Sequence, residues 1–481
     1  MADFHSPLTI ILDNGSSSIK VGSTQKEVPI YTMPSVVGYP STPVSPPSPS
    51  IRDRNSHDEN EENILQTSKL EGRNFFEREA DRVKSGADGS KWYAAEEAIE
   101  KRSHLFLRYP VEHGIVVDWN AMEHLWTHAL HKMNVPQSIC SNPITCSSST
   151  PTPAPTVSSS FSPSSSPSPP HHTRVMLTEA MLGPTLQRQR ATEIMIEKLN
   201  ISAVFIGLQS VLSLFASGRT TGLVIDSGYG VTHVVPVYEG YPLPHAIQTM
   251  HVGGKHLTNF MLYLLQKNPG FDCQDKKDMR EQLEIAEDVK KKLCYVALDY
   301  EKECISQLQQ EKLRLEACYS LPAPRLRLST EKFTCPEAMF RPSLLKAMEG
   351  DANKVDYCEA NNHCDKENGL PSKVARAIRN CEVEIRVELL SNIVLAGGNT
   401  CFTGLKERLR MDLAALGAKA LGVQSEEEVE KLKVIAMSNG SQLAWTGGCI
   451  LAQQLPAERW VTKEVYDEVG QSVMNKYAQL S

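Results

Sequence analysis

Residues 11–18 read ILDNGSSS, and the chain echoes this stretch once, as VIDSGYG at residues 224–230. In each copy an apolar run of strand character ends in an Asp-polar-Gly turn, and a second apolar run follows. Glycine and small side chains let backbone N–H groups approach an anion, and an Asp offers the oxygen ligands that Mg²⁺ and Ca²⁺ prefer. The two turns therefore indicate a phosphate and metal site built from two halves of the chain.

A third turn fits beside these two. The apolar run IVLA at residues 393–396 leads into Gly397 and Gly398, and a helical stretch begins near Leu405. Backbone donors and the positive end of a helix dipole could face an anion there. Lys20 adds a point charge within reach of a phosphate. A single Asp-x-Gly turn more often only joins two strands, so a plain turn stays open as the alternative for each copy.

The composition limits the class of protein. The chain has 481 residues, of which 41% are hydrophobic and 22% charged, and its formal net charge is -7. These values are typical of a globular protein and argue against a general surface for nucleic acid or anionic membranes. No apolar run is long enough to span a membrane, and the N-terminus lacks the features of a secretory signal. We therefore expect no direct nucleic-acid binding, no membrane span, and reduced cysteines in the cytoplasm or nucleus.

Strand-like and helical runs alternate along most of the chain, which is typical of an α/β protein whose sheets are covered by helices. Two stretches differ in composition: residues 41–90 are charged and Pro-rich, and residues 137–172 are dominated by Ser and Pro. Both have too few apolar side chains to offset the entropy of ordering the chain. We predict disordered, flexible insertions there, and a smaller polar insertion at about residues 350–369.

Nine strings, in order along the chain, resemble the actin family. They are DNGS at 13–16, YPVEHGIV at 109–116, LTEA at 177–180, QSVLSLFASGRTTG at 209–222, VTH at 231–233, YEGY at 238–241, KLCYVALD at 292–299, CPE at 335–337 and GG at 447–448. The match runs from about residue 9 to about residue 478 and is interrupted by the insertions. On these strings the chain is identified as a divergent member of the actin and actin-related family.

The resemblance implies a fold and a division into domains. The fold is α/β and actin-like, with two lobes whose duplicated RNase-H-like domains surround a central nucleotide cleft. The first lobe would take residues 1–40, 91–217 and 440–481, and the second would take residues 218–439. The insertion at 41–90 falls in the region of the family's DNase-binding loop.

The resemblance also implies a ligand, ATP or ADP with Mg²⁺ or Ca²⁺, and the residues that hold it. Asp13 and Asp226 would flank the metal through its waters, and Gln209 and His233 would position the attacking water that phosphoryl transfer requires. The residues implied at the phosphates are Gly15, Ser16, Lys20, Ser227, Gly228 and Gly230, and those implied at the ribose and base are Gly254, Lys290, Gly397, Gly398 and Phe402.

Some positions depart from the family pattern. Tyr229 stands where actin has an Asp in the second turn, and Ser17 replaces a glycine in the first. Near the base and ribose, Glu287 replaces an Arg, Lys291 replaces a Glu and Ser441 replaces a Lys. Charge is rearranged there and not simply lost. We expect nucleotide binding to persist and ATP hydrolysis to be weak or slow.

Three functions follow as hypotheses. The first is an actin-like cytoskeletal protein with altered polymerisation, whose partners are other actin-family subunits or actin-binding proteins. The alternative is a non-polymerising actin-related scaffold subunit of a multiprotein complex, of the chromatin-remodelling or dynein-activator type, with nucleotide as a stabilising ligand. An ATPase of the sugar-kinase and chaperone kind is disfavoured, because the actin strings run the length of the chain. We expect a cytoplasmic, cytoskeletal location, with the nucleus open as well.

Overall fold

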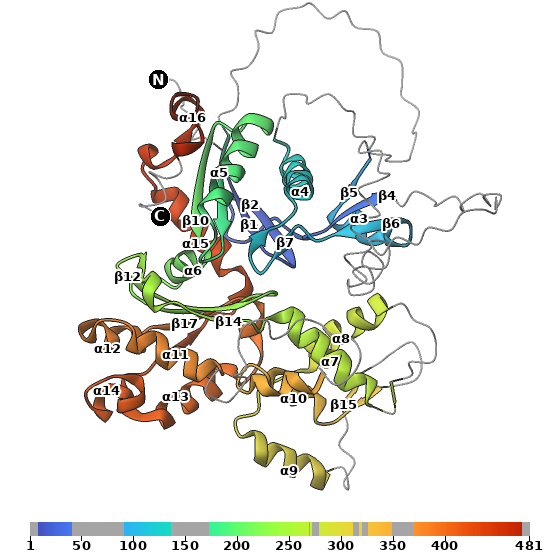
Figure 1. Cartoon of the computed structure of the whole chain (residues 1–481), viewed down its shortest axis with the longest axis vertical. Helices are drawn as coiled ribbons and strands as arrows, with labels where there is room; N and C mark the ends of the chain where they lie inside the picture. The colour runs from blue at the N-terminus through green and yellow to red at the C-terminus, as the bar shows by residue number, and fades with distance from the viewer. Residues whose placement is uncertain are drawn as a thin grey trace, which may run out of the picture.

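The computed structural model describes residues 8–40, 91–135, 173–268, 270–271, 279–310, 317–319, 326–348 and 369–473. The insertions predicted at 41–90 and 137–172 lie outside these ranges, and so does the one at about 350–369 apart from Gly369. Figure 1 shows two groups of elements, one around β1, β2 and β10 and the other around β12, β14 and β17. The mixed α/β architecture predicted from the alternating runs is confirmed.

Two large sheets form the framework, with strand orders β19-β10-β9-β1-β2-β3 and β13-β12-β11-β17-β18, and β14 pairs with β12 in the second. In the first sheet, β1 (Leu8–Asn14) pairs antiparallel with β2 (Ser18–Ser23) and parallel with β9 (Thr173–Glu179). The first acidic turn is therefore the short connection between β1 and β2.

The second sheet repeats this arrangement. Its strand β11 (Gly222–Ser227) pairs antiparallel with β12 (Thr232–Tyr238) and parallel with β17 (Ile393–Ala396). The second acidic turn joins β11 to β12 in the same way. The echo in the sequence is thus also an echo in sheet topology.

The remaining elements complete the two sheets and their coverings. The other strands are β3 (Tyr31–Pro34), β4 (Val37–Pro40), β5 (Tyr93–Ala94), β6 (Leu105–Arg108), β7 (Val111–Glu112), β8 (Ile115–Val116), β10 (Ala203–Leu208), β13 (Tyr241–Pro242), β14 (Gln248–Met250), β15 (Ala317–Tyr319), β16 (Leu326–Leu328), β18 (Val434–Ala436) and β19 (Val461–Thr462). The helices are α3 (Ala95–Glu100), α4 (Trp119–Lys132), α5 (Thr185–Glu193), α6 (Gln209–Ala216), α7 (Gly254–Gln266), α8 (Met279–Leu293), α9 (Tyr300–Gln310), α10 (Glu331–Glu337), α11 (Leu370–Arg379), α12 (Val383–Ser391), α13 (Leu405–Leu421), α14 (Glu426–Glu430), α15 (Leu443–Gln454) and α16 (Lys463–Val469). Short helical turns include η1 (Arg102–His104), η6 (Gly398–Cys401) and η7 (Gly440–Gln442).

Strand β1 is buried on both faces, as expected for a central strand covered by helices on each side. Its residues Ile10 and Leu12 join one core cluster with Trp126 of α4, while Ile11 joins another with Trp445 of α15. We call the elements packed around this sheet the first lobe.

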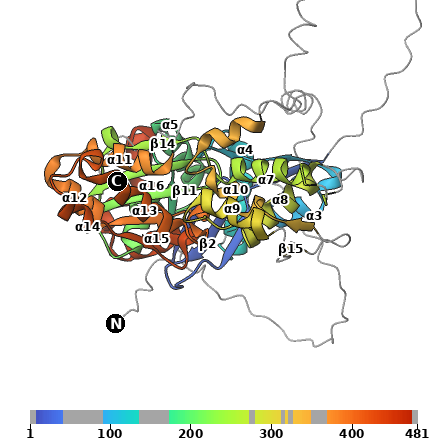
Figure 2. The same cartoon turned by 90° about the horizontal axis from the view of Figure 1, so that it is seen from below.

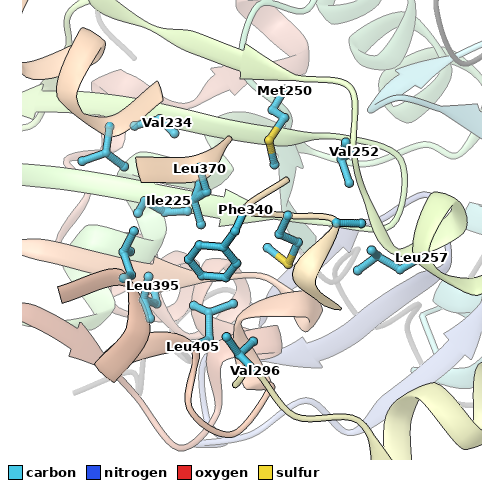
Figure 3. Packing of buried hydrophobic residues seen from close by; sticks show 14 of the residues in the cluster. Ile225, Val234, Met250, Val252, Leu257, Val296, Phe340, Leu370, Leu395 and Leu405 are labelled. Carbon is cyan, nitrogen blue, oxygen red and sulfur yellow. The ribbon is translucent and has the colours of Figure 1, made fainter. Parts of the chain in front are cut away.

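The second lobe has a core of its own (Figure 3). Ile225 of β11 and Leu395 of β17 lie in one buried cluster. Phe340, Leu370 and Leu405, from three other segments of the chain, pack in the same cluster. Seen from below, the helices α11 to α14 gather at one end of the molecule and α7 to α10 toward the other (Figure 2). The cluster holds both helix groups against the second sheet.

Helices α6 and α15 connect the two lobes. Helix α15 packs on β1 and β9 of the first sheet, whereas α6 contacts β11 and β17 of the second, and the two helices pack extensively on each other. Their crossing is a main-chain contact: a Cβ atom on Gly447 of α15 would lie 1.7 Å from the carbonyl oxygen of Leu212 in α6. Only glycine permits this approach.

Candidate functional site

The ends of β1 and β11 meet a cavity of about 500 Å³ that both lobes line. Asp13 comes from β1 and Asp226 from β11, and each acid feels the charge of the other or of Lys20. The residues predicted for the site that line this cavity are Asp13, Gly15, Ser16, Lys20, Gln209, Asp226, Gly228, Gly230, His233, Gly254, Lys290, Gly397, Gly398 and Phe402. Residues that were predicted from the sequence to share one site therefore line one cavity in the structure.

Ser227, predicted at the phosphates as part of the second turn, is not among the residues that line this cavity. It is fully buried, its hydroxyl lies 2.8 Å from the hydroxyl of Thr232, and it accepts a hydrogen bond from Asn399 Nδ2 at 3.1 Å. The alternation of β11 turns Ser227 away from the face that carries Asp226. Its side chain holds the second turn against the third turn.

Asp13 is held as a carboxylate by its neighbours. Lys20 Nζ donates to one of its oxygens at 2.8 Å, and Thr178 Oγ1 and Gln209 Nε2 donate to the other at 2.6 and 3.0 Å. Burial raises the pKa of Asp13, but the charge of Lys20 and these three hydrogen bonds outweigh burial and hold the pKa below its ordinary value. Asp13 is therefore charged at neutral pH.

Asp226 has the opposite environment. Burial and then the charge of Asp13 raise the pKa of Asp226 to about 6, with Lys20 acting against them. Among the described residues no hydrogen bond or ion pair reaches its carboxylate. Two acids that face one cavity with a single lysine between them leave negative charge uncompensated, and oxygen ligands of this kind suit a divalent cation. The donor set fits Mg²⁺ or Ca²⁺.

Gln209, at the start of α6, and His233, on β12, also line the cavity. The Gln209 amide also donates to the carbonyl oxygen of Asn14 at 3.0 Å, so it is fastened to the first turn. His233 places Nδ1 at 3.2 Å from the Thr249 hydroxyl, and its buried Nε2 has no hydrogen-bond partner in the part of the chain that the structure describes. Burial, with a smaller effect of His251, lowers the pKa of His233 to about 4. Its imidazole is neutral at physiological pH.

The second turn is docked onto the start of α7. The N–H groups of Gly254 and Lys255 donate to the carbonyl oxygens of Gly228 and Tyr229 at 2.9 and 2.8 Å. A Cβ atom on Gly254 would lie 3.4 Å from Cδ2 of Tyr229, so the Tyr229 ring rests against this helix start. Tyr229 lines the cavity without filling it. The first N–H groups of α7 serve the turn and are not offered to a ligand.

The third turn depends on a glycine conformation. Gly397 has φ +88°, and a Cβ atom there would lie 2.2 Å from the carbonyl oxygen of Ser227. Asn399, from the same turn, donates through Nδ2 to the carbonyl oxygen of Gly228 at 2.7 Å. No role was predicted from the sequence for Asn399, which follows the Gly397-Gly398 turn, or for Thr178, which stands in the LTEA string at 177–180.

Helix α8 also contributes to the wall of the cavity. Lys290 is buried and its ammonium donates to the carbonyl oxygen of Gly254 at 2.8 Å and to the Thr258 hydroxyl at 2.7 Å, so it fixes α8 to α7. Next to it, Glu287 and Lys291 form an ion pair at 2.7 Å. Both side chains of that pair also line the cavity.

The two sheets are topologically equivalent, and each presents an acidic turn to a shared cavity with glycine-rich loops. These features define a two-lobed α/β protein with a cavity between its lobes. The family model described as Actin matches residues 6–479. The chain belongs to the actin family, and the actin-like fold expected from the resemblance is confirmed. No helix in the described ranges is long and apolar enough to cross a membrane.

Proposed function

We propose that the cavity binds ATP or ADP together with Mg²⁺ or Ca²⁺. The observation that carries this proposal is the pair Asp13 and Asp226, supplied by equivalent strands of two sheets and left with excess negative charge beside three glycine-containing turns. A divalent cation relieves that charge, and backbone N–H groups of the turns suit phosphate oxygens. Membership of the actin family supports the same ligand.

The residues divide the work of binding. Asp13 and Asp226 would hold the cation through its waters, and Lys20, already 2.8 Å from Asp13, would carry positive charge to the phosphates. A bound cation would neutralise charge on the phosphates. Gly15 and Ser16 of the first turn, with Gly228 and Gly230 of the second, would offer small residues where phosphate oxygens must come close.

Hydrolysis in this cavity would be slow. His233 stays neutral and its Nε2 faces no described partner, so it can orient a water molecule but holds no proton to donate from an imidazolium. The Gln209 amide nitrogen is shared among Asp13, Asn14 and Thr178, which limits its freedom to follow a reacting water. The second turn carries Tyr229 in place of a third acid.

In the cell we propose an actin-like cytoskeletal role with altered polymerisation, in contact with other actin-family subunits or actin-binding proteins. The location would be the cytoplasm and its cytoskeleton. The fastened Gln209 also favours a second candidate, a non-polymerising scaffold subunit in which the nucleotide stays bound as a stabilising ligand, in the cytoplasm or the nucleus. Sedimentation with Mg-ATP separates the two: pelleting supports the filament former, and purification at fixed stoichiometry with other subunits supports the scaffold.

Thermal melting tests nucleotide binding itself. A ligand at 100 times its dissociation constant stabilises the folded state by about 2.7 kcal/mol, so Mg-ATP should raise the melting temperature by several degrees. Asp226→Asn and Asp13→Asn should remove most of this rise. Glu337→Gln is the matched control, because it alters a buried acid that lies outside the cavity. If Mg-ATP, Mg-ADP and their calcium forms all leave the melting temperature of the wild type unchanged, the proposal is wrong.

A further inference from the structure

The segment that leads into α15 contains an Asn-Gly pair, Asn439 and Gly440. The same dipeptide also occurs at residues 14–15 and 368–369. Glycine has no Cβ atom to shield its amide nitrogen, so that nitrogen can attack the side-chain amide of the asparagine before it. Asparagine is one of the thermally labile residues of proteins. The surroundings of each Asn-Gly pair therefore decide whether it reacts.

Asn439 is exposed, and its side chain is not held in place. It lies directly before η7, and its side chain makes no capping hydrogen bond to that short helix. Gly440 is the first residue of η7, so its N–H has no acceptor within the helix. The side-chain amide of Asn439 and the main-chain nitrogen of Gly440 are therefore both available for reaction.

The pair of Asn14 and Gly15 has the opposite surroundings. The side-chain oxygen of Asn14 accepts a hydrogen bond from Trp126 Nε1 at 3.0 Å. Its side-chain nitrogen donates to the carbonyl oxygen of Thr178 at 3.3 Å. A reaction at Asn14 would have to break both bonds, so Asn14 is an internal reference in the same molecule. Asn368 lies outside the described residues.

The main chain at residues 439–440 supports one wall of the cavity. The residues of η7, which are Gly440, Ser441 and Gln442, all line the cavity. The carbonyl oxygen of Gly440 accepts the N–H of Gly397 in the third turn at 3.0 Å. The carbonyl oxygen of Asn439 accepts the N–H of Gln442 at 2.8 Å. A change in the main chain at this point would therefore disturb both η7 and the third turn.

We propose that Asn439 is a site of spontaneous deamidation and that the product weakens the contact between η7 and the third turn. The Gly440 nitrogen bonds to Cγ of Asn439, the Cγ–Nδ2 bond breaks, and the amide proton of Gly440 leaves with the nitrogen as ammonia. Water then adds to one of the two carbonyl carbons of the succinimide ring and opens it to aspartate or isoaspartate. This inference does not depend on which ligand the cavity binds.

The isoaspartate product carries the structural effect. Its main chain runs through Cβ, so one carbon atom is added between residues 439 and 440, and a free carboxylate is left on the side. The Gly440 carbonyl oxygen then no longer lies where the Gly397 N–H meets it. The aspartate product has the same new charge but keeps the ordinary main chain.

Peptide mass spectrometry measures the reaction after the full-length protein has been incubated in heavy-oxygen water at neutral and at mildly alkaline pH. Asn439 should convert roughly 10- to 100-fold faster than Asn14, because Asn14 must first give up two hydrogen bonds. The rate should rise with pH, since the attacking nitrogen must lose its proton. Conversion of Asn439 that is absent, or no faster than that of Asn14, would overturn the proposal.

Two variants separate the reaction from its effect on the wall. Asn439→Gln would have to close a larger ring and should stay unconverted over the same period, whereas Asn439→Asp has the charge of the product on an ordinary main chain. Hydrogen exchange at the Gly397 N–H should be roughly 3- to 10-fold faster in the aged wild type than in the fresh protein. It should be unchanged in aged Asn439→Gln and in fresh Asn439→Asp. Equal exchange at Gly397 before and after conversion would show that the product leaves the third turn intact and would overturn that part of the proposal.

Discussion

Arg102 of the first lobe forms an ion pair with Glu284 of α8 in the second lobe. This contact joins η1 to α8, several residues of which line the cavity, so the pair links the lobes beside the cavity. The two side chains are 32% and 52% exposed, which places the pair among surface ion pairs worth about 0.2–1 kcal/mol. Loss of the pair should therefore weaken the contact between the lobes and change the stability of the whole fold only slightly.

Breaking this pair should release nucleotide faster. Arg102→Met and Glu284→Gln should each raise the dissociation rate of a fluorescent ATP analogue by roughly 1.5- to 5-fold, and the double variant should resemble the singles. Lys101→Met is the control, since Lys101 pairs with Glu97 inside the first lobe. Additive effects in the double variant would show that the two residues act separately.

His256 should make the protein sensitive to acid. Burial, then the nearby His113, Lys255 and His251, lower the pKa of His256 to about 4, and its Nδ1 accepts the Gly253 N–H at 3.0 Å. Because the folded-state pKa lies below the ordinary value near 6.5, the unfolded chain binds more protons in this range. Folding stability is then retained above pH 6.5 and lost as the pH falls toward 4.

The measurement is urea unfolding at several pH values between 7 and 4. His256→Gln keeps an acceptor for the Gly253 N–H but removes the titrating ring, so its stability should fall less over this range, by about 2–3 kcal/mol. Parallel stability curves for the wild type and the variant would contradict the assignment of this loss to His256.

The helix crossing at Gly447 should tolerate no side chain. Gly447→Ala would set a Cβ atom 1.7 Å from the Leu212 carbonyl oxygen, and the two helices must separate to admit it. We expect a loss of about 3 kcal/mol or more in the free energy of unfolding. Gly448→Ala is the milder neighbour, because its Cβ would meet the Ile11 side chain at 3.1 Å. Equal costs for the two variants in denaturant unfolding would rule out this account.

A buried ion network should stabilise the second lobe. Arg408 donates to Glu337, which has no exposed surface, to Asp412 and to the carbonyl oxygen of Ala297. Arg408→Met removes the partner that compensates Glu337 most fully and should cost about 3–5 kcal/mol in urea unfolding. Arg408→Met combined with Glu337→Gln should recover part of this loss. No recovery would mean that the arginine acts through packing alone.

The sequence predicted the parts of the site that depend on local pattern. The turns after β1 and β11 could be read from Asp, Gly and the apolar runs before them, and the resemblance added Gln209, His233 and Phe402. The sequence could not predict the direction of a side chain where partners elsewhere in the fold determine that direction. The Ser227 hydroxyl hydrogen-bonds with Thr232 and Asn399. The Lys290 ammonium donates to the Gly254 carbonyl oxygen of α7.

The place of the Tyr229 ring could not be predicted from the sequence either. Its size and position in the second turn left open whether the ring would fill the cavity. The answer depends on the start of α7, because the Tyr229 ring lies close to Gly254 there and the turn's carbonyl oxygens accept hydrogen bonds from Gly254 and Lys255. Such a contact joins residues that are separated in the chain, and the local sequence around neither residue predicts it.

The contact between Gly447 and Leu212 fixes the point at which the two halves of the protein meet most closely through α6 and α15. Because main chain meets main chain there, the halves have little room to slide past each other at this point. The same two halves carry Asp13 and Asp226 and are joined again by the pair of Arg102 and Glu284. A ligand held between Asp13 and Asp226 would therefore bear on how the two halves are set against each other.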